Sequence, residues 1–184
     1  MVVVAVLAAC SDDDGSPVEP DPTVVQPTTT TTSQPPPDVS LTVIRSDVIG
    51  PDAPTHPLVD PTLAEVVELV DRFLDVTSLH PLTGQPGPGL AGIMTDDAAQ
   101  RATTTDRAVV FDEGVPPAPS VEAVEATVDL QALARPANQL ELVVAGVVWE
   151  VKGAIGVRRT GELTLVPTAD GWRISAYDLA VSRS

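Results

Sequence analysis

The C-terminal third of the chain most constrains the fold, because apolar and polar residues alternate there with a period of two. Residues 120–131 follow this alternation, which is typical of a strand with one buried face. Three later segments also have strand character, at residues 139–151, 157–166 and 172–181. Asp170-Gly171 is a hairpin signal between the last two. Because all the connections are short, we expect a curved antiparallel sheet of about four strands.

Residues 60–79, which precede these strands, predict an amphipathic helix. Asp60 is suited to the N-cap and Pro61 to the first helical position. Apolar residues recur at helical spacing on one face, namely Leu63, Val66, Val67, Val70, Phe73 and Leu74. A shorter helix is predicted over residues 95–103, and a short strand over 108–111. The fold class is therefore α+β, with N-terminal helices packed on the sheet.

Composition excludes several classes of protein. The formal net charge of -16 would repel nucleic-acid phosphates and anionic lipid headgroups, so we expect no nucleic-acid partner. Cys10 is the sole cysteine, which excludes an internal disulfide and a cysteine-based zinc site. Hydrophobic residues make up 43% of the chain but aromatic residues only 3%, so the core must consist mainly of aliphatic side chains.

The N-terminal segment predicts where the protein is located. A short apolar run ends at Cys10 and is followed by Ser11 and three aspartates. The run is too short to span a bilayer, which needs about 20 apolar residues. A buried strand is the alternative, but the acidic, proline-rich sequence that follows disfavours it. Leu7-Ala8-Ala9-Cys10 resembles the bacterial lipobox. The resemblance implies cleavage before Cys10, acylation of its sulfur, for example with palmitate, and attachment to the extracytoplasmic face of the cell membrane.

Three regions follow from this order. Residues 1–10 are predicted to be a lipoprotein signal peptide. Residues 11–57 are rich in proline, threonine and aspartate, a composition that cannot bury enough apolar surface to fold, so they predict a disordered linker. Within it, residues 39–44 are a candidate additional strand. Residues 58–184 are predicted to be the folded α+β domain.

The closing sequence Asp170-Gly171-Trp172-Arg173-Ile174, after one long helix and a meander, resembles the end of NTF2-like (cystatin-like cone) domains. The resemblance implies a curved sheet wrapped around the first helix, with a pocket at the open end of the cone. That family includes isomerases, dehydratases and proteins without known catalysis, so the resemblance does not fix an activity.

Few residues are candidates for a site. Trp149, Trp172 and Tyr177 could line a ligand pocket, although burial in the core is the favoured interpretation for the tryptophans. We predict no catalytic residue, metal site or cofactor, because the two histidines lie in the linker and at a helix end and no ligand or triad spacing is found. Glu150 is expected to pair across strands with Arg158 or Arg159.

The favoured function is a non-enzymatic, lipid-anchored binding or accessory domain for a small apolar ligand or an envelope protein. One alternative is a small isomerase- or dehydratase-like enzyme that uses the cone pocket. Another is a structural accessory with an exposed apolar patch. We also expect Trp172, Ile174 and Ala176 to share one side of the last strand and to face the first helix.

Overall fold

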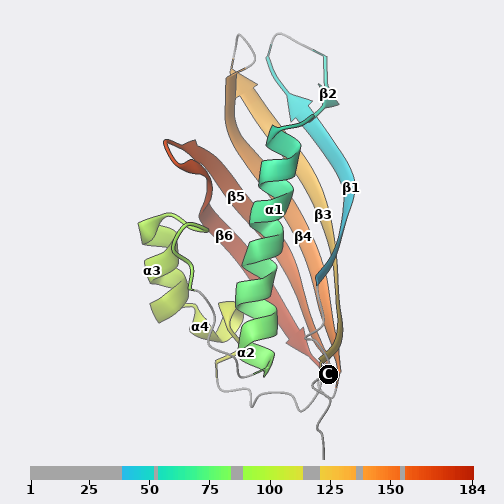
Figure 1. Cartoon of the computed structure of the whole chain (residues 1–184), viewed down its shortest axis with the longest axis vertical. Coiled ribbons are helices and arrows are strands. Elements are labelled where there is room, and N and C mark those ends of the chain that lie inside the picture. Colours follow the sequence, from blue (N-terminus) through green and yellow to red (C-terminus); the bar gives the residue numbers. More distant parts are fainter. Residues whose placement is uncertain (1–38, 52–53, 84–88, 114–120, 136–138, 154–155) are drawn as a thin grey trace, which may run out of the picture. The chain divides into compact units, whose positions relative to one another are not determined.

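The computed structural model describes residues 39–51, 54–83, 89–113, 121–135, 139–153 and 156–184. The chain divides between Gln34 and Pro35 into two units, and all the described residues belong to the second. Cys10, the predicted signal peptide and most of the predicted linker therefore lie outside the described residues. The second unit contains one six-stranded sheet with one main helix against it (Figure 1).

Four long strands form the predicted meander. They are β3 (Val121–Arg135), β4 (Gln139–Gly153), β5 (Val157–Thr168) and β6 (Gly171–Arg183). Each pairs antiparallel with the next, which confirms the prediction for this part of the chain. Their burial alternates from residue to residue, because one face of the sheet meets the helix and the other meets solvent.

Two further strands make the predicted fold class wrong. β1 (Val39–Ile49) and β2 (His56–Pro57) extend the sheet, whose order is β2-β1-β3-β4-β5-β6. β1 runs parallel to β3, so the sheet is mixed and six-stranded instead of a four-stranded antiparallel NTF2-like cone. A parallel pair needs a long crossover, and here the crossover includes every helix of the described chain. The candidate strand at residues 39–44 is part of β1, and β1 and β2 both lie in the segment assigned to the linker.

The prediction of several helices packed on the sheet was also wrong. α1 (Thr62–Leu74) is the main helix, and it continues through a π-helical turn, η1 (Asp75–Leu79), into α2 (His80–Thr83). No side chain caps its start, so Asp60 does not have the predicted role. α3 (Asp96–Thr104) confirms the predicted second helix. The predicted strand at 108–111 is instead helix α4 (Arg107–Val110), because a short apolar run does not distinguish the two structures.

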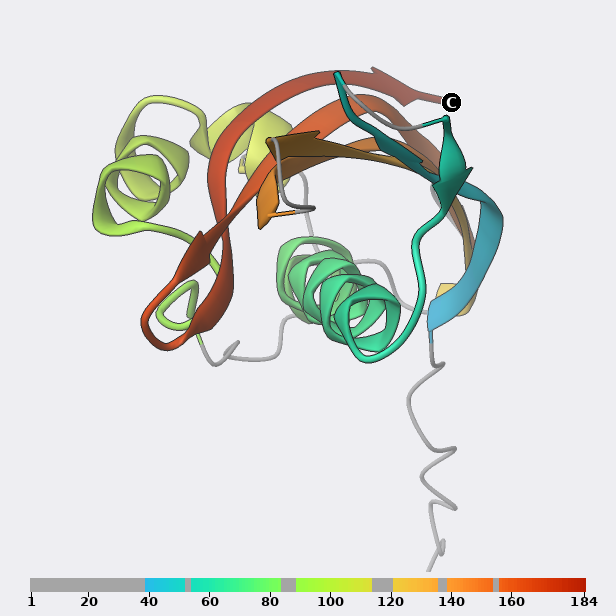
Figure 2. The same cartoon turned by 90° about the horizontal axis from the view of Figure 1, so that it is seen from above.

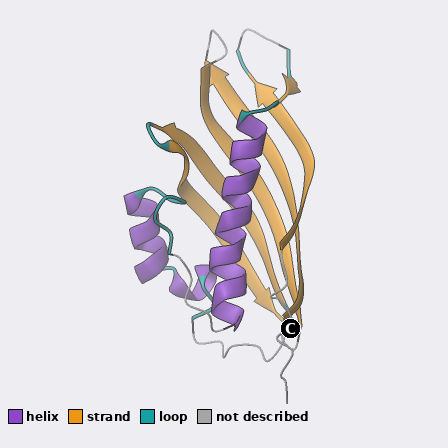
Figure 3. Ribbon diagram, in the orientation of Figure 1, coloured by secondary structure: helices purple, strands orange, loops and turns teal. Residues whose placement is uncertain are grey.

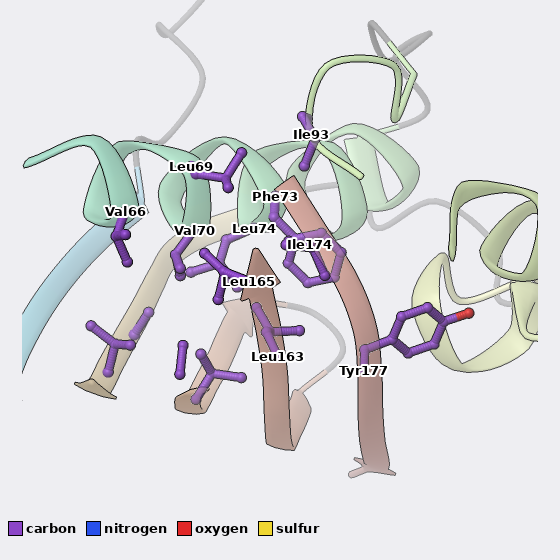
Figure 4. Close-up of a cluster of buried hydrophobic side chains, with 14 of the residues drawn as sticks. Val66, Leu69, Val70, Phe73, Leu74, Ile93, Leu163, Leu165, Ile174 and Tyr177 are labelled. Atoms are coloured by element: carbon purple, nitrogen blue, oxygen red, sulfur yellow. The ribbon is translucent and has the colours of Figure 1, made fainter. Parts of the chain in front are cut away.

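The core lies between α1 and the inner, concave face of the sheet. Viewed from above, the sheet curves around α1 (Figure 2). Val66, Val70 and Phe73 on α1 are fully buried, and Figure 4 shows them directed toward the strands. Leu163 and Leu165 on β5 meet them from the other side. This packing explains the amphipathic pattern of α1, because its other face is charged and exposed.

A bulge changes the orientation of side chains along β6. Trp172 and Ile174 are buried as predicted, but Ala176 is exposed and Tyr177 is buried. The pairing with β5 shifts between Thr164 and Leu165, so one extra residue of β6 exchanges the two faces beyond this point. The expectation that Ala176 faces the helix was therefore wrong.

The two edges of the sheet differ. At the β6 edge the backbone N–H of Ile174 donates to Ile93, and the N–H of Thr95 donates to the carbonyl of Ile174. α3 and α4 continue this cover farther along β6 (Figure 3). At the other edge β2 pairs only with Asp47 and Val48 of β1. The helices thus occupy the inner face and the β6 edge, and no helix among the described elements lies on the outer face.

Candidate functional site

An apolar patch lies on the outer face of the sheet, near the end of β1 and the connection between β3 and β4. Ile49 and Leu133 are paired neighbours on β1 and β3, and their exposed fractions are 41% and 39%. Leu142 lies opposite Leu133 on β4, and Val144 follows two residues later on the same face. We call these four residues the outer patch. They alternate with the buried residues Ala132 and Val143, so they point away from the core.

A row of residues next to the outer patch crosses the sheet. It runs Arg45, Asp129, Gly146, Glu162 and Asp178, one residue from each of β1, β3, β4, β5 and β6. Arg45 donates to both carboxylate oxygens of Asp129, at 2.9 and 2.5 Å, and this pairing raises the pKa of Arg45. The negative charge of Asp129, at this end of the row, is therefore compensated by Arg45.

The other end of this row keeps its negative charge. Glu162 and Asp178 are directly opposite each other on β5 and β6, and both are exposed. None of the ion pairs found among the described residues includes either of them. Like charges directly opposite each other in a sheet are destabilising. The domain therefore carries an unfavourable pair on its outer face without a compensating cation among the described residues.

Gly146 separates the two ends of the row, and its described neighbours leave room for a Cβ there. A Cβ at this position would lie 3.8 Å from the nearest atoms, the Cβ and carbonyl oxygen of Asp129, which is ordinary contact. Gly161 is a useful contrast, because its Cβ would lie 2.0 Å from the carbonyl oxygen of Asp178. A glycine within a strand weakens it and often marks close approach by a ligand or another backbone.

A broad hollow lies farther along the same face. Its volume is about 480 Å³. The outward side chains that line it are polar or small, namely Ser40, Thr42, Glu125, Thr127, Val148, Glu150 and Arg158. Glu125 pairs with Lys152 at 2.7 Å, and Glu150 pairs with Arg158 at 3.8 Å, one of its two predicted partners. The charges in the hollow are therefore neutralised in pairs, so they do not converge on one point as in an active site.

The predicted pocket residues do not line one common cavity of the described chain. Trp149 is 1% exposed, its Nε1 donates to Ser78 Oγ at 2.7 Å, and its ring meets Phe73 edge to face. Trp172 is 9% exposed and borders a hollow of about 150 Å³ beside α1. Both tryptophans thus belong to the core, the favoured interpretation.

Tyr177 is directed away from the other core side chains and toward α3 (Figure 4). Its hydroxyl donates to Asp106 Oδ2 at 2.8 Å, and Arg101 Nε donates to it at 3.2 Å. Burial raises the pKa of Tyr177, while the hydrogen bond from Arg101 acts in the opposite direction. These bonds attach α3 to β6, which gives Tyr177 a structural role.

A buried charge cluster at the end of the sheet was not predicted from the sequence. Arg159 is 0% exposed, bonds to Asp112 and donates from Nε to the carbonyl of Val109 at 3.0 Å. Arg183 also bonds to Asp112, at 2.6 Å. Burial lowers the pKa of Arg159, although Asp112 opposes this effect. Its inward position could have been found from the alternation of Val157, Arg159 and Leu163 on β5.

A second recess lies where α1 ends. Two adjoining hollows of about 280 and 220 Å³ share Val76, His80 and Gly89. Arg72 borders one hollow, and Arg107 borders the other. Arg107 is already paired with Glu113 at 2.9 Å. The η1 turn adjoins this recess, and π-helical turns are frequent at functional sites. The recess is open, and both apolar and charged side chains line it.

Other kinds of site are not found in the described part of the chain. It contains no group of three or more His, Cys, Asp or Glu side chains able to hold a metal ion. No helix within it is long and apolar enough to cross a membrane. No family model, curated protein or solved structure matches the chain. The outer face is therefore the candidate site that the geometry favours.

Proposed function

We propose that this chain is a lipid-anchored bacterial protein on the extracytoplasmic face of the cell membrane, whose folded domain is a non-enzymatic accessory that binds another envelope protein. The anchor rests on Leu7-Ala8-Ala9-Cys10, which has the residues of a lipobox. The proline- and threonine-rich sequence that follows would hold the domain away from the bilayer.

The filled inner face is the observation that favours a protein partner over a small ligand. The side chains of α1 that face the sheet are buried in one hydrophobic core together with Trp149 and Trp172. Across the sheet, the outer face presents exposed aliphatic side chains and no covering helix among the described elements. An exposed apolar patch with a polar rim is typical of a protein-binding surface.

The alternative of an isomerase- or dehydratase-like enzyme has less support. Such an enzyme needs a carboxylate base within an apolar cavity. Among the described residues Asp112 is the buried carboxylate, and Arg159 and Arg183 already bind it. Both carboxylate oxygens of Asp112 therefore already accept hydrogen bonds from guanidinium groups, which gives this residue a structural role.

Membrane fractionation of Cys10→Ser tests the anchor, with Ser11→Ala as the control. We expect the parent chain and Ser11→Ala to stay with membranes in high salt, to be released by detergent and to incorporate a labelled fatty acid. Cys10→Ser should lose the label and leave the membrane fraction, or accumulate uncleaved. Membrane association of Cys10→Ser equal to that of the parent, after cleavage of the N-terminal run, would contradict the anchor.

A further inference from the structure

The outer face combines three features that its own domain does not explain. The outer patch (Ile49, Leu133, Leu142 and Val144) is apolar, and no helix or strand of the described chain covers it. Glu162 and Asp178 are like charges directly opposite each other, and no ion pair among the described residues includes either of them. Gly146 lies between the patch and these carboxylates, although a Cβ would fit there.

We propose that this surface docks a basic, aliphatic segment of a partner protein. Its apolar side chains would cover the outer patch, its backbone would approach the sheet over Gly146, and a lysine or arginine would lie between Glu162 and Asp178. This inference rests on the proposed accessory function and names the chemistry of the partner.

The spacing of the sheet makes these contacts mutually compatible. Val144 and Gly146 are two residues apart on β4, which corresponds to roughly 7 Å. Glu162 is adjacent to Gly146 on β5, and Asp178 is one strand farther, so they lie about 5 and 10 Å from it. One extended segment of a few residues can therefore reach the patch and the two carboxylates at once.

The charges on the outer face indicate which kind of partner would bind there. Arg45, Lys152 and Arg158 on the outer face are already paired, with Asp129, Glu125 and Glu150. The uncompensated groups that remain beside Gly146 are carboxylates, so a cation is the complementary ligand. A second copy of the chain would bring the same carboxylates together, and an anionic bilayer would be repelled. A basic protein segment fits where these two do not.

Calorimetric titration of the 184-residue chain with two synthetic heptapeptides tests this chemistry. The probe alternates leucine and lysine, and the control peptide alternates leucine and glutamate. We expect the leucine–lysine peptide alone to bind. Glu162→Gln with Asp178→Asn should weaken its binding about tenfold. Asp96→Asn with Asp97→Asn on α3 is the matched control, because it removes the same charge from another exposed surface and should leave the affinity nearly unchanged.

Two further variants test the apolar contact and the close approach. Leu133→Ser should weaken binding about tenfold. Val59→Ser is its control, because Val59 is also exposed, at 66%, but lies outside the patch. Gly146→Gln should abolish binding without lowering the unfolding midpoint, since it adds a side chain where the probe must lie. Circular dichroism of every variant identifies any that fails to fold.

Several results would overturn the inference. They are absence of binding, equal binding of the two peptides, and equal weakening by the two charge-matched double variants. Self-association of the chain that Leu133→Ser abolishes would assign the surface to a second copy. Vesicle binding by Cys10→Ser that Leu133→Ser abolishes would assign it to the membrane. The titration does not involve lipidation, so a failed anchor test and a failed docking test can be told apart.

Discussion

Replacement of Asp112 by asparagine should be among the most damaging single changes in the domain. Asp112 is 3% exposed and binds Arg159, which is fully buried, and Arg183. Its backbone is left-handed, with φ of 54°. Asparagine tolerates that conformation, so the substitution changes charge and keeps the backbone. Removal of one partner from a buried ion pair costs roughly 3–5 kcal/mol, a large part of a typical stability of about 5–15 kcal/mol.

Urea unfolding followed by tryptophan fluorescence measures this cost. Glu113→Gln is the matched control, because Glu113 is the next residue and its ion pair with Arg107 is exposed. That pair should contribute less than about 1 kcal/mol. Adding Arg159→Met to Asp112→Asn should recover part of the loss, because no unpaired buried charge then remains. A loss below about 1 kcal/mol for Asp112→Asn would refute the argument that buried Arg159 depends on the carboxylate of Asp112.

Three further predictions concern stability. Ser78→Ala should lower the free energy of unfolding in urea by about 1–3 kcal/mol, because the indole N–H of buried Trp149 loses its acceptor. An unchanged midpoint would mean that this N–H donates to another acceptor. Gly161→Ala should lower the melting temperature strongly while Gly146→Ala leaves it unchanged or raises it, and the reverse order would contradict the glycine geometry. Burial raises the pKa of Tyr177, so folding favours its protonated form. The contribution of Tyr177 to the free energy of unfolding should therefore be complete below pH about 10 and be lost as the pH rises through the raised pKa. As Tyr177 is the sole tyrosine, phenolate absorbance reports this titration directly, and a pKa at or below the ordinary value would contradict it.

The parts of the fold that depend on local pattern could be predicted from the sequence. Period-two alternation located β3 and helical spacing located α1, because both patterns record which side chains meet the core. Apolar segments and the Asp170-Gly171 turn located β4 to β6, and a capping residue followed by two acids located α3. The positions of Trp149 and Trp172 in the core followed from their size and rarity.

The long-range features could not be predicted in this way. β1 follows a proline-rich sequence and pairs in parallel with β3. β3 begins at Val121, 72 residues after β1 ends at Ile49, so no local signal indicates the pairing. The bulge that exposes Ala176 leaves the alternation of β6 without a visible mark. The outer patch also escaped notice, because Ile49 was assigned to the linker and Leu133 lies beyond the strand predicted to end at residue 131.

Site-specific photocrosslinking in living cells tests the central claim, that the domain acts through its outer face, most directly. A photoreactive residue at Val144 lies on the outer patch, and one at Glu68 lies on the exposed side of α1. We predict a discrete protein adduct from Val144, none from Glu68, and loss of the Val144 adduct when Gly146→Gln is added. An adduct from Glu68 alone, or a Val144 adduct that Gly146→Gln leaves unchanged, would contradict the account.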